Sequence, residues 1–168
     1  MQNSFVIDHT SSNTFANKSL LLDTNILIDA YRLPVEFYDL QQSLVASGCD
    51  LVAIKSVIIE FLGGTKDKDK INDKVLFLES LFGKKLESTY LPLERDKPAI
   101  SNLLEFGRHA NKFSVPDYEL YCSLKKYGKN IALVTRNHKD FPASLVNRIS
   151  FITLLGKAEI HTYGIYTA

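Results

Sequence analysis

The sequence predicts an α/β fold with a central parallel sheet of about five strands flanked by helices. Short apolar runs alternate with longer segments in which apolar residues recur at helical spacing. Strands that are buried on both faces have continuous apolar sequences, and strands that alternate with helices pair in parallel through crossover connections. The predicted strands are residues 18–22, 50–54, 88–93, 130–134 and 149–154.

The segments between these strands are predicted to be helices. Pro34 separates the first two, because proline cannot continue a helix but is accepted in the first turn of the next one. Ser114, Pro116 and Asp117 form a helix start, with a serine N-cap, a proline in the first turn and an acid near the helix N-terminus. The predicted helices are residues 24–32, 35–46, 56–62, 71–82, 94–111 and 114–127.

The length and composition indicate one ordinary globular domain. The chain has 168 residues, of which 45% are hydrophobic and 23% charged. Residues 1–18 are predicted to be a polar N-terminal tail and residues 19–168 a single domain. The net charge of +1 favours no polyanion, so nucleic-acid binding would need local charge or bound cations. Without a signal peptide or a membrane-spanning run, we expect a cytoplasmic protein with no membrane partner.

Four acids occupy positions that the predicted fold can bring to one edge of the sheet. Asp23 and Asp140 follow the first and fourth strands, and Glu60 and Asp117 lie on helices that can converge there. Each has an ordinary alternative: a helix cap for Asp23, a solvent-facing acid for Glu60, a helix-dipole acid for Asp117 and a turn acid for Asp140. Clustered carboxylates stay ionised together only when cations bind, and oxygen ligands select Mg²⁺ or Mn²⁺. Such ions serve phosphodiester hydrolysis.

Polar residues beside these acids are candidates for a supporting role in binding the metal or the substrate. They are Thr24, Asn25, Glu119, Thr135, Arg136 and Asn137. Thr135 and Asn137 share a loop with Asp140 and can orient a water molecule or a carboxylate. Arg136 lies in the same loop, where its positive charge could contact a phosphate of the substrate.

Four segments of the chain, LLLDTNILID, SVIIEF, PDYELYCSLKKYG and NIALVTRNHKDF, occur in this order. They resemble PIN-domain ribonucleases, most of all the VapC-type toxins of toxin–antitoxin pairs. The resemblance implies a PIN-like three-layer sandwich and endoribonucleolytic cleavage that depends on Mg²⁺ or Mn²⁺. It also implies an acidic quartet at Asp23, Glu60, Asp117 and Asp140. Many family members have an acid where this chain has Asn137, so either Asn137 or Asp140 could be the closer metal partner.

The same resemblance implies partners: an RNA substrate, a small DNA-binding antitoxin and a second copy of the chain. An apolar stripe is a possible dimer interface or, alternatively, part of the core; its members are Ile71, Val75, Leu78 and Phe82. A second hypothesis is a PIN-type nuclease without an antitoxin, acting in RNA processing or DNA repair. A third, of another class, is a metal-binding receiver-like signalling module, although Asp23 lacks the acidic neighbour usual in receivers.

Overall fold

The computed structural model describes residues 4–7, 14–82, 97–112 and 114–168. One sheet holds all the described strands in the order β1-β5-β6-β4-β2-β3. The strands are β1 (Phe5–Ile7), β2 (Ser19–Leu22), β3 (Asp50–Val52), β4 (Ile131–Thr135), β5 (Asn147–Leu155) and β6 (Ile160–Thr167). The described α-helices are α1 (Thr24–Arg32), α2 (Pro34–Ala46), α3 (Lys55–Gly63), α4 (Lys68–Phe82), α5 (Lys97–His109) and α6 (Val115–Tyr127).

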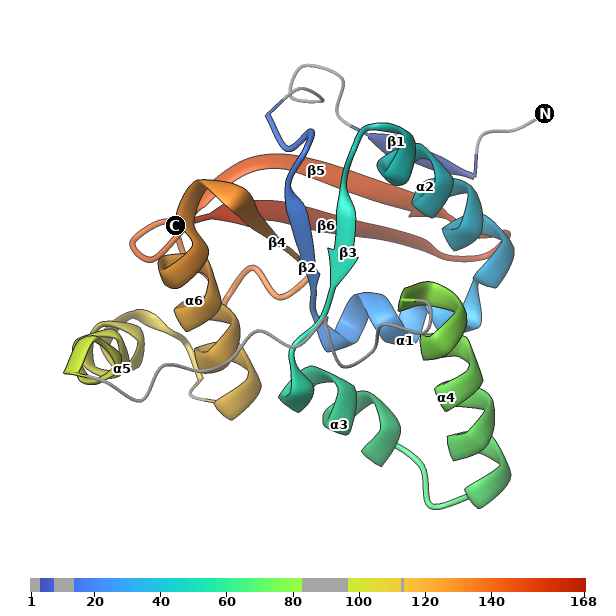
Figure 1. The fold of residues 1–168 in the computed structure, drawn as a ribbon, viewed down its shortest axis with the longest axis horizontal. Helices are drawn as coiled ribbons and strands as arrows, with labels where there is room; N and C mark the ends of the chain where they lie inside the picture. Colours follow the sequence, from blue (N-terminus) through green and yellow to red (C-terminus); the bar gives the residue numbers. More distant parts are fainter. Residues whose placement is uncertain (1–3, 8–13, 83–96, 113) are drawn as a thin grey trace.

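The sheet is mixed, so the predicted central parallel sheet of a PIN-like three-layer sandwich is wrong. β2 pairs in parallel with β3 and with β4, whereas β6 runs antiparallel to β4 and β5, and β1 runs antiparallel to β5. No strand is predicted after residue 154, but the structure has β6 at residues 160–167. A turn closed by the Gly156 N–H and the Glu159 carbonyl, 2.8 Å apart, joins β5 to β6 as a hairpin. A short turn forces antiparallel pairing, and the sheet curls into a half-barrel (Figure 1).

The other predicted elements are confirmed with small shifts at their ends, except where the chain is not described. The predicted strand at residues 88–93 lies outside the described residues. Within the predicted tail, residues 5–7 form β1, in which Phe5 pairs with Leu154 and Ile7 with Ile152. Part of the apolar stripe on α4 belongs to the core of the chain itself and not to an exposed surface. Leu78 is buried in the core, and Phe82 packs against the core. Among the helices described, none combines the length and the apolar composition needed to cross a membrane.

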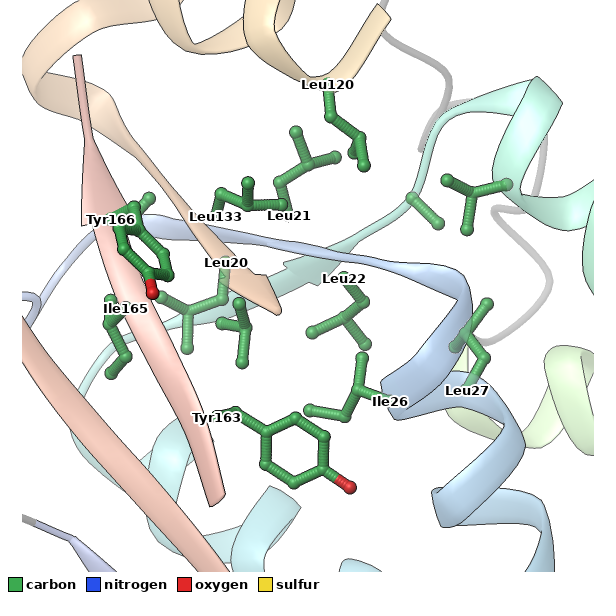
Figure 2. Packing of buried hydrophobic residues seen from close by; sticks show 14 of the residues in the cluster. Leu20, Leu21, Leu22, Ile26, Leu27, Leu120, Leu133, Tyr163, Ile165 and Tyr166 are labelled. Atoms are coloured by element: carbon green, nitrogen blue, oxygen red, sulfur yellow. The ribbon is translucent and has the colours of Figure 1, made fainter. Parts of the chain in front are cut away.

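The parallel strands β2 and β4 form the buried centre of the sheet. Their side chains alternate between the two faces, as in any strand. Figure 2 shows Leu21 and Leu133 on the side of Leu120 from α6, and Leu22 on the side of Tyr163 and α1. Burial on both faces explains why β2 and β4 have continuous apolar sequences. Because the two strands pair in parallel with Leu22 opposite Val134, the polar residues that end them lie together at one edge of the sheet.

Helix caps mark the two helices that begin at this edge. The side chain of Asp23 caps α1 by accepting the Thr24 N–H, and Ser114 caps α6 by accepting the Asp117 N–H. α6 ends at Gly128, whose φ of 52° is the left-handed conformation that favours glycine. The predicted serine cap of α6 and the alternative role of Asp23 as a helix cap are therefore confirmed. Asp23 lies at the start of α1, and Asp117 lies in the first turn of α6.

Candidate functional site

The carboxyl ends of β2 and β4 meet at one edge of the sheet. Leu22 pairs with Val134, so the residues that follow, Asp23 and Thr135, lie side by side. The Asp23 N–H donates to the Val134 carbonyl at 3.2 Å, which extends the ladder by one bond. Asp23 is buried, with 5% of its surface exposed. These two strand ends therefore meet as predicted, although the sheet as a whole is mixed.

Three neighbours hold the Asp23 carboxylate in a fixed orientation. Its Oδ1 accepts the Thr24 N–H at 2.6 Å, and its Oδ2 accepts both the Thr135 hydroxyl and the Asn25 side-chain amide at 2.5 Å. The Asn25 amide also reaches the Thr135 hydroxyl at 3.1 Å, while its carbonyl accepts the Arg136 N–H at 3.1 Å. Thr24, Asn25 and Thr135 thus act on the predicted acid directly.

Glu60 and Asp117 reach the same edge from α3 and α6. The Thr24 hydroxyl donates to Glu60 Oε2 at 2.5 Å, so the N-terminus of α1 contacts both Asp23 and Glu60. The Ser114 hydroxyl donates to Asp117 Oδ2, and the Asp117 N–H returns to Ser114 Oγ at 3.2 Å. Glu60 is exposed and Asp117 half-buried. Each of these acids is therefore positioned by a hydroxyl group of a neighbouring residue.

Asp140 lies on the loop after β4 and forms a unit with Asn137. Its Oδ1 accepts the Lys112 N–H at 2.9 Å, and its Oδ2 accepts the Asn137 side-chain amide at 2.6 Å. The Asn137 N–H in turn donates to Thr135 Oγ1 at 2.9 Å. Asn137 therefore links Asp140 to the residue that holds Asp23, and both candidates for the closer metal partner belong to one hydrogen-bonded group.

The four carboxylates affect one another electrostatically. Burial raises the pKa of Asp23 to about 6; the Thr135 hydrogen bond opposes this, and the negative charges of Asp117 and Glu60 add to it. Burial also raises the pKa of Asp117, and the charges of Asp140 and Glu60 raise it further. Asp117 is thus coupled to the other three acids, while Asp140 joins the group through Asp117.

The positive charge of Lys112 lowers the pKa of Asp117, opposing the larger effect of burial, but Lys112 forms no ion pair with it among the described residues. The ion pairs found among the described residues involve none of the four carboxylates. In the same part of the chain, no three histidine, cysteine, aspartate or glutamate side chains lie close enough to hold one ion jointly. Mg²⁺ commonly takes one or two carboxylates and completes its shell with water and substrate phosphate. The all-oxygen donor set fits a divalent cation held in that way, and it does not form an all-protein cage.

Two further candidates lie apart from the carboxylates. Glu119 shares a side of α6 with Cys122, whose pKa its negative charge raises after the larger effect of burial. We call the sheet edge that carries Asp23, Glu60, Asp117 and Asp140 the acidic edge. None of the contacts among the described residues joins Glu119 to it. Arg136 donates its backbone N–H to Asn25, but its guanidinium binds Asp29 Oδ2 at 3.0 Å and hydrogen-bonds the His161 ring. The Arg136 side chain is therefore engaged within the protein.

Asp29, the partner of Arg136, is not among the residues predicted from the sequence. Only 1% of the Asp29 surface is exposed. Its Oδ2 accepts the Tyr163 hydroxyl at 2.6 Å and lies 3.5 Å from His161 Nδ1. Asp29 ties α1 to β6 and to the loop that carries Asn137. The available signal was its position on α1, because Asp29 falls on the apolar face that includes Ile26, where an unpaired acid is costly.

No protein-family model, no curated protein and no solved structure matches this chain. The likeness to PIN-domain ribonucleases consequently remains an interpretation of the four motifs. The geometry and charge of the acidic edge are independent of that interpretation, since they follow from the contacts around Asp23, Glu60, Asp117 and Asp140.

Proposed function

We propose that this chain is a Mg²⁺- or Mn²⁺-dependent endoribonuclease that hydrolyses RNA phosphodiester bonds at its acidic edge. The observation that carries the proposal is the environment of Asp23, a buried carboxylate that faces two further acids and has no ion pair among the described residues. Burying a charge without a partner is costly. A divalent cation would supply the missing positive charge, and a phosphodiester is a substrate that such an ion can activate.

The roles of the carboxylates follow from how they are coupled. Asp23 would hold the ion directly with at most one of Glu60 and Asp117, and the other acid would act through bound water. The coupling supports this grouping, because the charges of Glu60 and Asp117 raise the pKa of Asp23 and the charge of Glu60 raises the pKa of Asp117. Asp140 would add negative charge beside Asp117. Together with Asn137, to which it is hydrogen-bonded, Asp140 would orient a water molecule at the edge of the site. When bound, the ion would lower the pKa of a water molecule and neutralise charge on the phosphate.

The neighbouring polar residues would keep these carboxylates preorganised. Thr135 and Asn25 hold Asp23, Thr24 holds Glu60, and Ser114 holds Asp117. Partners of this kind fix the orientation of metal-binding carboxylates and limit the reorganisation needed when the ion and substrate bind. The site uses only the parallel pair β2 and β4, the starts of α1 and α6 and the second half of α3, so it is compatible with the mixed sheet.

Cleavage of labelled single-stranded RNA and DNA by the purified protein tests the proposal. RNA should be cut in Mg²⁺ or Mn²⁺, and EDTA should stop the reaction. Asp117→Asn should remove most of the activity, whereas Asp73→Asn, the same change at an exposed position of α4, should leave it intact. Full activity in EDTA would refute the metal mechanism, and cleavage of DNA alone would refute the assignment to RNA.

We further propose that the chain is the toxin of a toxin–antitoxin pair, a homodimer of the cytoplasm bound by a small DNA-binding antitoxin. The support for this part is the resemblance of the motifs to VapC-type toxins. A short neighbouring gene whose product co-purifies with this chain and suppresses its nuclease activity would support it. A nuclease with no such neighbour would favour the alternative role in RNA processing or DNA repair, and a monomer at all concentrations in sedimentation would refute the homodimer.

A further inference from the structure

A cavity of about 400 Å³ opens beside the loop that follows β4. His138 and Phe141 from this loop line it, together with Tyr166 from β6 and Arg148 from β5. The loop therefore has two sets of side chains. Asn137 and Asp140 bind each other and belong to the acidic edge, whereas their neighbours in sequence, His138 and Phe141, line the cavity.

Two aromatic rings that are packed into the core form the floor of the cavity. Phe141 is 1% exposed and Tyr166 is 4% exposed, so both rings are packed into the core. The Tyr166 ring occupies space beside Gly164, where an added Cβ would lie 2.5 Å from the ring. The Tyr166 hydroxyl hydrogen-bonds His138 Nδ1, which fixes the imidazole at the wall. The absence of a side chain at residue 164 thus allows the ring to form the floor.

Arg148 places a positive charge at this cavity. It pairs with Tyr166 across the β5–β6 ladder and is exposed. Its charge lowers the pKa of both His138 and Tyr166, although burial has the larger effect on each group. Among the residues that the structure describes, no carboxylate forms an ion pair with Arg148. The cavity therefore combines an apolar floor with a guanidinium group that has no anionic partner there.

We infer that this cavity binds one nucleotide of the substrate, with a phosphate on Arg148 and the base or ribose over the floor formed by Phe141 and Tyr166. A planar guanidinium can bind phosphate through two parallel hydrogen bonds. The cavity volume lies at the small end of the range for ligand sites, which suits a single nucleotide. The assignment to RNA rests on the proposed function. The loop after β4 connects the two places, because it carries His138 and Phe141 at the cavity and Asn137 and Asp140 at the acidic edge.

Binding of nucleoside 5′-monophosphates in EDTA tests this inference without any cleavage. Calorimetric titration should give a dissociation constant for at least one of the four monophosphates, and its nucleoside should bind about tenfold or more weakly. Arg148→Gln should weaken the monophosphate by about ten- to a hundredfold and leave the nucleoside unchanged, as expected for a lost charged hydrogen bond. Arg32→Gln removes the same charge from the end of α1 and should change neither affinity.

A second variant tests the shape of the cavity and keeps its charge. Ala143 is an exposed residue of the lining, so Ala143→Leu should fold normally and should weaken the monophosphate and the nucleoside alike. Inorganic phosphate should bind about tenfold or more weakly than the monophosphate. Phosphate binding as tight as the monophosphate would overturn the inference, because the floor would then contribute nothing. Equal losses in Arg148→Gln and Arg32→Gln would also overturn it.

The two proposals fail in different ways. If Asp117→Asn retains phosphate-dependent binding while the wild type cleaves no RNA, the nucleotide site stands and the nuclease function fails. If the wild type cleaves RNA while Arg148→Gln leaves monophosphate affinity unchanged, the nuclease function stands and the nucleotide site is refuted.

Discussion

Asp23 and Asp29 are two buried aspartates of similar exposure, one capping α1 and the other within its last turns, but their surroundings are opposite in charge. Asp29 is 1% exposed, accepts the Tyr163 hydroxyl and binds the Arg136 guanidinium. Asp23 is 5% exposed, accepts hydrogen bonds from neutral groups and faces the charges of Asp117 and Glu60. Burial alone therefore does not distinguish an acid that has a cationic partner from one that faces other acids.

The charged groups around a buried carboxylate indicate its role. A carboxylate with a guanidinium and a hydroxyl partner is compensated in the folded state, so removing it leaves those partners unsatisfied. A carboxylate beside other carboxylates is uncompensated until a cation binds, so removing its charge relieves repulsion. Asp29 is expected to stabilise the fold, and Asp23 is expected to lower the stability of the metal-free protein and to bind metal.

The largest expected effect is on catalysis. Asp23→Asn should lower the rate of RNA cleavage by about 10³-fold, equivalent to ~4 kcal/mol of transition-state stabilisation, because the ion would lose a charged ligand. The amide keeps the shape of the side chain and is an equally good N-cap, so the fold should persist. Initial rates in Mn²⁺, with circular dichroism as the check on folding, measure this effect. A folded variant with wild-type rates would remove Asp23 from the site.

The next effect is a dependence of metal-free stability on pH. Since burial raises the pKa of Asp23 from 3.8 to about 6, the folded state holds the proton more tightly than the unfolded state. Between about pH 4 and pH 6, the free energy of unfolding should therefore fall as the pH rises, by ~3 kcal/mol for Asp23 alone. The raised pKa of Asp117 acts in the same direction.

Urea unfolding in EDTA across this pH range measures the dependence. The slope should be smaller in Asp23→Asn than in the wild type, because the variant has no titrating group at this position. Equal slopes in the two proteins would show that burial and the neighbouring acids do not raise the pKa of Asp23, and the contrast with Asp29 would then lose its physical basis.

Metal binding should reverse the repulsion. Mn²⁺ at a hundredfold excess over its dissociation constant should stabilise the wild type by ~2.7 kcal/mol. Thermal melts should show a much smaller gain in Asp23→Asn and Asp117→Asn, and an unchanged gain in the control Asp73→Asn. The same response to metal in all four proteins would mean that the carboxylates of the acidic edge do not share an ion.

The smallest effect concerns the compensated aspartate. Asp29→Asn should lower the free energy of unfolding by ~2 kcal/mol, because the charged acceptor for Arg136 and Tyr163 is lost, and Tyr163→Phe should cost ~1 kcal/mol. Both variants should retain the stabilisation by Mn²⁺. A gain in stability for Asp29→Asn, measured by urea unfolding without metal, would place Asp29 in the same class as Asp23.

Local sequence patterns predicted much of the acidic edge. Apolar runs that end at Asp23 and shortly before Asn137 indicated strands buried on both faces, and such strands end at a common edge when they are parallel. Ser114 and Asp23 indicated helix starts because their side chains accept backbone N–H groups within a few residues. These features depend on neighbours in sequence, so a single sequence is sufficient to predict them.

Local patterns were therefore sufficient to predict the helices, the buried strands β2 and β4 and the acids that follow them. The antiparallel half of the sheet depends on contacts between distant parts of the chain, because β6 pairs with β4 as well as with β5, its partner in the hairpin. Such contacts also decide which aspartate is compensated. Tyr163 lies 134 residues after Asp29 in the chain, and contacts at such separations follow from packing of the whole domain, which local propensity does not specify.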